Sequence, residues 1–66
     1  MASFKIQHYD NHAYRTVGWE RSIGGSGLRV HTLADQFDHG RFRVLSPRGK
    51  VVLKGRVVKH GEIEFD

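Results

Sequence analysis

Apolar and polar residues alternate along most of this chain, as expected for β-strands that bury one face. In the first such segment Phe4 and Ile6 are separated by a polar residue, so both side chains fall on the same side of a strand. The strands predicted from this two-residue period cover 4–8, 14–21, 28–31, 41–45, 50–59 and 62–65. Turn-forming residues lie between several of these segments, which favours an antiparallel sheet.

The strand expected at 14–21 is less regular than the others. Strict alternation places Val17 and Trp19 on the buried side and Tyr14 on the opposite side. Gly18 interrupts the pattern and marks a candidate β-bulge. After this strand, residues 23–27 contain three glycines, whose backbone freedom predicts a flexible loop.

One segment has the features of a helix. Thr32 is a residue type that caps helices, and Leu33 and Phe37 are spaced one helical turn apart. Gly40 is suited to ending the helix. The sequence therefore predicts one or two helical turns over 33–39, placed at one end of the sheet.

The clearest hairpin signal joins the segments 41–45 and 50–59. Between them, the sequence Ser46–Pro47–Arg48–Gly49 fits a β-turn with proline at its second position. The fold class expected for residues 1–66 is a single mainly β domain with one short helix. Its sheet is expected to be a five- or six-stranded antiparallel meander, or an open barrel of SH3-like or OB-like kind.

The core expected for this domain consists of the apolar residues on the inward sides of the strands and the helix. They are Phe4, Ile6, Val17, Trp19, Leu28, Val30, Leu33, Phe37, Phe42, Val44, Val51, Leu53, Val57, Ile63 and Phe65.

Length and composition narrow the class of protein. A chain of 66 residues buries only about 60% of the surface of its unfolded form, so support from self-association is expected. Disulfides and zinc-thiolate sites are excluded, because the chain has no cysteine. The longest apolar run, Val51–Leu53, is far shorter than the roughly 20 residues of a membrane span. We expect a cytoplasmic homo-oligomer without membrane contact.

Charge is distributed unevenly. The net charge is +4, yet residues 41–59 hold seven basic side chains and no acidic one, whereas residues 1–40 are balanced and residues 62–66 are acidic. A positive field of this kind attracts polyanions. In residues 41–59 the basic residues alternate with apolar ones, so a ribbon with one apolar and one basic face is expected.

The charge pattern predicts a non-catalytic protein that contacts nucleic-acid phosphates through a basic hairpin. Such a two-stranded ribbon is narrow enough for the major groove of DNA. The candidate binding residues are Arg41, Arg43, Arg48, Lys50 and Tyr14. By contrast, three further basic residues, Lys54, Arg56 and Lys59, are expected to face the acidic side chains of Glu62, Glu64 and Asp66 across the last hairpin.

Other chemistries have weaker signals. His8 with His12 and Asp35 with His39 are pairs only, whereas a metal site needs three or four ligands, so no metal or other cofactor is expected. No catalytic motif is present, and so small a sheet offers little room for a shielded active site. The alternative hypothesis is an assembly module that pairs a strand edge with another chain and docks its basic hairpin on an acidic protein.

Overall fold

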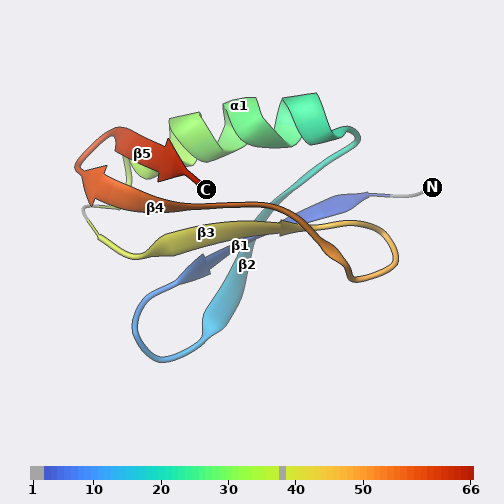
Figure 1. Cartoon of the computed structure of the whole chain (residues 1–66), viewed down its shortest axis with the longest axis horizontal. Coiled ribbons are helices and arrows are strands. Elements are labelled where there is room, and N and C mark those ends of the chain that lie inside the picture. Colours follow the sequence, from blue (N-terminus) through green and yellow to red (C-terminus); the bar gives the residue numbers. More distant parts are fainter. Residues whose placement is uncertain (1–2, 38) are drawn as a thin grey trace.

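The computed structural model of this protein describes residues 3–37 and 39–66. Within these residues the chain forms β1 (Phe4–Tyr9), β2 (Tyr14–Glu20), α1 (Ile23–Ala34), β3 (Arg41–Leu45), β4 (Val51–Lys59) and β5 (Glu62–Phe65). The strands make one open antiparallel sheet in the order β2-β1-β3-β4-β5, and α1 lies on one of its faces (Figure 1). The predicted fold class, a small antiparallel β domain with one short helix, is confirmed.

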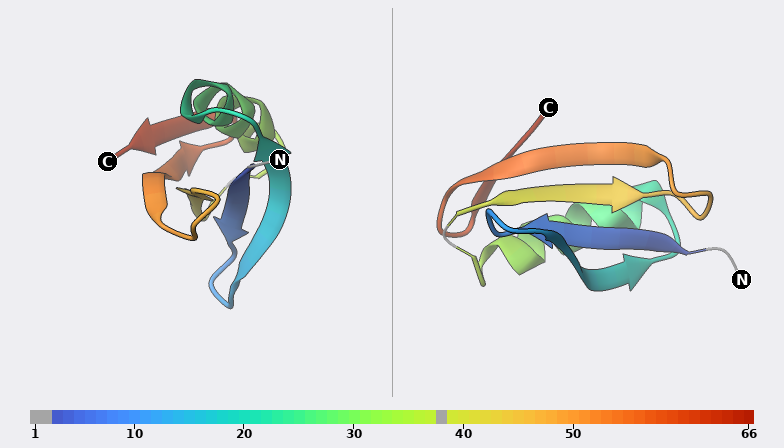
Figure 2. Two further views of the ribbon diagram at one scale, coloured as in Figure 1. Left: turned by 90° about the vertical axis from the view of Figure 1, so that its right-hand side faces the viewer. Right: turned by 90° about the horizontal axis from the view of Figure 1, so that it is seen from below.

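The connections follow from this strand order. β1 and β2 form a hairpin, α1 then carries the chain across the sheet, and β3 pairs with the free side of β1. From β3 onward the chain is a meander through β4 and β5. As a result β2 and β5 are the edge strands, and the two further views show the sheet curving around α1 (Figure 2).

The helix is in a different place from the one predicted. The segment expected to be a glycine loop at 23–27 and a strand at 28–31 is helical, and α1 ends at Ala34, so the prediction of a helix over 33–39 is also wrong. Residue 38 of that range lies outside the described residues. Thr32, the predicted cap, lies inside α1, where its hydroxyl donates to the carbonyl of Leu28 at 3.2 Å.

Local and tertiary contacts explain why this glycine-rich segment is helical. The Ser22 hydroxyl caps the helix by accepting a hydrogen bond from the Gly25 amide at 3.0 Å. Ser26, Val30 and Ala34, four residues apart, form a buried stripe that faces the sheet. Burying this stripe offsets the cost of about 1 kcal/mol for each glycine in the helix. The propensity of the segment alone therefore gave the wrong prediction.

The core lies between α1 and the sheet. Its fully buried apolar members are Ile6, Val30, Ala34, Phe42, Val44, Val57 and Ile63, and six further residues of the predicted core, Phe4, Val17, Leu33, Phe37, Leu53 and Phe65, pack against them. One buried polar side chain belongs to the same layer. The His8 ring stacks on Phe37 at 3.9 Å between ring centres, and its Nε2 lies 3.0 Å from the carbonyl oxygen of His39.

Three residues of the predicted core are exposed instead. Leu28, 73% exposed, is two residues from Val30 on a helix and so points away from the sheet. The register shifts between Val44 and Leu45, so Val51 lies opposite Leu45 rather than on the core side.

Trp19 is the third of these residues, and it is 55% exposed. The pairing of β1 with β2 shifts after Gly18, which lies opposite Ile6, so that Thr16 lies opposite Gln7 and Val17 is the extra residue. This bulge, predicted at Gly18, moves Trp19 to the face away from α1, whereas Val17 still packs on the core.

No helix among the described residues could cross a bilayer, since α1 has 12 residues and a span needs about 20.

Two alanine substitutions test the helix and the sheet separately. A Cβ at Gly24 meets no atom within 4 Å, so Gly24→Ala should raise the free energy of unfolding by about 0.5 to 1 kcal/mol if this position is helical. A Cβ at Gly55 would lie 2.7 Å from the carbonyl oxygen of Glu64, so Gly55→Ala should lower the free energy of unfolding by about 1 to 3 kcal/mol. Urea denaturation measures both, and a destabilised Gly24→Ala would contradict the assignment of α1.

Two aromatic residues of the predicted core, Phe42 and Trp19, should respond differently to truncation. Phe42 is 1% exposed, so Phe42→Ala should cost about 3 to 5 kcal/mol, enough to unfold a domain of this size. Trp19→Ala should cost less than about 1 kcal/mol, because most of the Trp19 ring remains in solvent when the protein is folded. Thermal denaturation followed by circular dichroism measures both, and a large loss for Trp19→Ala would show that Trp19 is a core residue.

Candidate nucleic-acid interface

The face of the sheet opposite α1, called the open face here, is covered by no other element of the described residues (Figures 1 and 2). Residues that lie opposite each other in neighbouring strands share a face, so the strand register arranges its side chains in rows. The first row is Trp19, Lys5, Leu45 and Val51; the second is Thr16, Gln7, Arg43 and Lys54; the third is Tyr14, Tyr9, Arg41, Arg56 and Glu64.

Arg43 is the most firmly held cation of the open face. Its guanidinium carbon lies 3.7 Å from the centre of the Tyr14 ring, within the range of a cation–π contact. Its Nε also donates a hydrogen bond of 2.8 Å to Oε1 of Gln7. The Tyr14 ring is in turn 5.1 Å from the ring of Tyr9. These contacts, made by three adjacent strands, fix the guanidinium at the centre of the face.

Most of the positive charge on the open face is not neutralised. Of its five cations, Arg56 forms an ion pair with Glu64 at 3.0 Å, whereas no described carboxylate lies within ion-pair distance of Lys5, Arg41 or Lys54. The acidic groups of this face are confined to its β5 edge. The positive potential is therefore centred on β1, β3 and the first half of β4.

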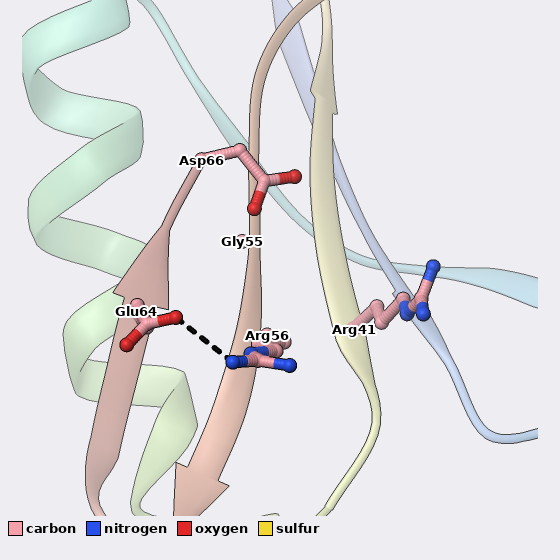
Figure 3. A pocket seen from close by; sticks show the side chains of 5 residues that line it. All are labelled: Arg41, Gly55, Arg56, Glu64 and Asp66. Atoms are coloured by element: carbon pink, nitrogen blue, oxygen red, sulfur yellow. Dashed lines mark hydrogen bonds and ion pairs between the residues drawn. The ribbon is translucent and has the colours of Figure 1, made fainter.

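A hollow of about 220 Å³ at the β5 edge shows how this boundary is built (Figure 3). Arg41, Gly55, Arg56, Glu64 and Asp66 line it. Arg56 points to Glu64, while the guanidinium of Arg41 points away from that pair, toward the neighbouring strand (Figure 3). Arg41 therefore contributes its charge to the centre of the open face rather than to the acidic edge.

Trp19 lies at the opposite end of the face. The ammonium group of Lys5 is 5.2 Å from the centre of its ring. Beside the ring is a hollow of about 250 Å³, whose lining is formed by Trp19 and Lys5 together with Ser3, Leu45, Ser46, Pro47 and Gly49. The β3–β4 turn thus forms one wall of the hollow.

That turn has the geometry expected from its sequence. The Gly49 amide donates to the carbonyl of Ser46 at 2.8 Å, and Gly49 has φ +87°, which glycine adopts without strain. The Ser46 hydroxyl accepts from the amides of Arg48 at 3.3 Å and Lys50 at 3.2 Å. Both of these basic residues are exposed on the turn, outside the rows of the open face.

The β1–β2 turn adds little net charge to the molecule. Asp10 accepts hydrogen bonds from the amides of His12 and Ala13 and lies 3.5 Å from Nε of Arg15. Desolvation raises the pKa of Asp10, but these amides and the charge of Arg15 lower it by more, so the pKa lies below its ordinary value of 3.8. Asp10 is therefore ionised at neutral pH and balances Arg15.

The structure separates the predicted binding residues into two groups. Arg41, Arg43 and Tyr14 lie together on the open face, whereas Arg48 and Lys50 lie at the turn. Arg56 and Lys59 pair with the acidic tail as expected, Arg56 with Glu64 at 3.0 Å and Lys59 with Glu62 at 3.3 Å. Lys54 also lies across the hairpin from the tail, because its carbonyl accepts from the Asp66 amide at 3.0 Å, but its ammonium group forms no ion pair with a described carboxylate.

The predicted binding residues left out Lys5, Gln7, Tyr9 and Trp19 of the open face, and also Lys54 and Arg56, which were expected to face the acidic tail. Lys5, Gln7 and Tyr9 could have been found, because they alternate with the inward Ile6 and therefore share the outer side of β1. Trp19 could not be found by alternation alone, because the bulge reverses its side.

Within the described part of the chain, no three histidine or acidic side chains gather as metal ligands would. The chain matches no protein-family model, no curated protein and no solved structure.

Proposed function

We propose that this protein binds nucleic acid without catalysing a reaction, and that the open face makes the phosphate contacts. The observation that carries this proposal is the gathering of five cations from three adjacent strands on one uncovered face, with only Arg56 of them in an ion pair among the described residues. The five are Lys5, Arg41, Arg43, Lys54 and Arg56.

The spacing of these cations favours a polyanion over a small anion. Adjacent strands lie about 4.8 Å apart and alternate residues about 6.7 Å apart, so the five cations occupy a patch of about 10 by 13 Å. This size is comparable to the Debye length of about 8 Å at physiological salt, and the fields of the cations therefore overlap. A chain of phosphates gains from such an extended field, and releases counterions when it binds.

The sheet, rather than an isolated hairpin, would form the binding surface. β3 is hydrogen-bonded to β1 as well as to β4, so the β3–β4 hairpin is not a free two-stranded ribbon. Only its turn, with Arg48 and Lys50, extends beyond the paired strands. We assign this turn to flanking phosphate contacts at the Trp19 end of the open face.

Salt dependence and matched double variants test the proposal. If about five phosphates are neutralised, log affinity should fall with log salt with a slope of about −3.5 for a single strand or −4.5 for a duplex. Arg41→Gln/Arg43→Gln should weaken binding at low salt by at least about tenfold and reduce the slope by about 1.4 to 1.8. Fluorescence anisotropy of a labelled oligonucleotide at several salt concentrations measures affinity and slope.

The control removes the same net charge from the other face. Arg15 lies opposite the inward-facing His8, and the guanidinium of Arg29 on α1 pairs with Glu20 at 2.8 Å. Neither side chain belongs to the open face. Arg15→Gln/Arg29→Gln should therefore leave the affinity within about threefold of the parent. Equal losses for the two double variants would mean that only net charge attracts the ligand. Absence of micromolar binding at low salt would refute the proposal.

The alternative, a self-assembly module, is supported by the outer surface of α1. Ile23 and Leu28 are 49% and 73% exposed there, and a second copy of the chain would cover them. Sedimentation equilibrium of the parent and of Leu28→Ser distinguishes the two functions. A discrete oligomer that Leu28→Ser dissociates, together with no affinity for oligonucleotides, would favour assembly, whereas a monomer that binds oligonucleotides would exclude it.

A further inference from the structure

We infer that the nucleic acid recognised by the open face is single-stranded, and that Trp19 is the residue on which an unpaired base stacks. This inference rests on the proposed function and specifies the ligand of the same face. The observation behind this inference is that the bulge in β2 places the large aromatic side chain of Trp19 in solvent.

The surroundings of Trp19 suit a base joined to a phosphate chain. The ring borders the hollow of about 250 Å³ described above, which is somewhat smaller than the roughly 300 to 1,000 Å³ of sites for drug-sized ligands. A second hollow, of about 370 Å³, lies on the side of Ser3, Glu20 and Arg21. Of these two hollows, the first is the one bordered by Lys5 and the turn. It offers room for a planar group beside the indole, and the ammonium group at its edge is available to the adjoining phosphate.

The two tyrosines of the open face have a different role. The guanidinium of Arg43 already covers the ring of Tyr14, and Tyr9 lies beside the same ring. A base that stacked on the face of Tyr14 covered by Arg43 would displace this guanidinium and break its hydrogen bond to Gln7. We therefore assign Tyr14 to positioning Arg43 for a phosphate, and base stacking to Trp19.

The width of the sheet argues against an intact duplex. Five strands about 4.8 Å apart span about 19 Å, which exceeds the major groove of about 12 Å. The bases of a duplex are also stacked on one another, so their flat surfaces are not accessible to an indole ring. A single strand, in contrast, can lay its phosphates along Arg43 and Lys54 and turn a base toward Trp19.

The experiment uses the fact that Trp19 is the only tryptophan of the chain. Its fluorescence is followed while the protein is titrated with three probes of equal length: oligothymidylate, the same backbone without bases, and a duplex. A length of about 12 nucleotides lies within the site sizes of about 4 to 16 found for small single-strand-binding domains. Stacking predicts strong quenching by oligothymidylate and weak quenching by the abasic strand.

Variants provide the second measurement. Labelled oligothymidylate should bind Trp19→Ala about 5- to 100-fold more weakly than the parent, with Trp19→Phe in between. Leu28→Ala is the matched control, because it removes an exposed apolar side chain from the other layer, and its affinity should equal that of the parent. Circular dichroism of each variant establishes that it is folded.

The outcomes separate the two proposals. Equal affinity for the abasic strand and oligothymidylate, or no loss in Trp19→Ala, would overturn the stacking role of Trp19 while leaving phosphate binding intact. Tighter binding of the duplex than of oligothymidylate would overturn single-strand recognition. Failure of all three probes to bind at low salt would refute the proposed function, and with it this inference.

Discussion

The packing of one short helix against one face of the sheet is the contact on which the rest of the structure depends. Ser26, Val30 and Ala34 of α1 bury their side chains against the sheet, where Phe42 and Val44 complete the core. The described residues form a single helix, and it covers this one face. The second face of the sheet must therefore be compatible with water, which explains why polar and charged side chains alternate so regularly with the core residues along β1, β3 and β4.

Those strands were predictable because their alternation agrees with their tertiary environment. In β3, Phe42 and Val44 are buried while Arg41 is exposed, and the turn after Ser46 forms as its proline and glycine indicate. Arg48 and Lys50 lie at this turn, as the sequence predicts. Strand register was beyond prediction, because it depends on bulges that strict alternation does not reveal.

The helix and the Trp19 hollow could not be predicted, for a common reason. Gly24, Gly25 and Gly27 are poor helix formers, and Leu28 with Val30 satisfies the spacing of a strand as well as that of a helix. Only packing on the sheet, together with the Ser22 cap, makes the helix the more stable state. Trp19 was assigned to the core because strict alternation was applied across Gly18, although a bulge was expected there. In both places a contact distant in sequence outweighed the local pattern.

The open face combines two kinds of aromatic residue that sequence alone does not distinguish. The guanidinium of Arg43 lies over the Tyr14 ring, whereas the Trp19 ring has solvent beside it. In the proposed complex Tyr14 would therefore act on the ligand through Arg43. The guanidinium groups lie in the middle row and in the row of Tyr14, whereas the indole lies in the row at the other end, beside the ammonium group of Lys5. The two ends of the open face therefore differ chemically, whereas those of a uniformly basic surface would not.

The extra residue at Val17 has a consequence for how such a surface can change over generations. Substitutions in β2 alter one side chain at a time, but insertion or deletion of one residue exchanges the two sides of a strand for every position beyond it. Loss of Val17, in contrast, would remove the bulge and leave both Trp19 and Tyr14 on the open face, because the two would then be four residues apart and in phase with β1. A single-residue deletion in β2 could therefore remove the bulge without removing the exposed tryptophan, and the core would lose only the Val17 side chain.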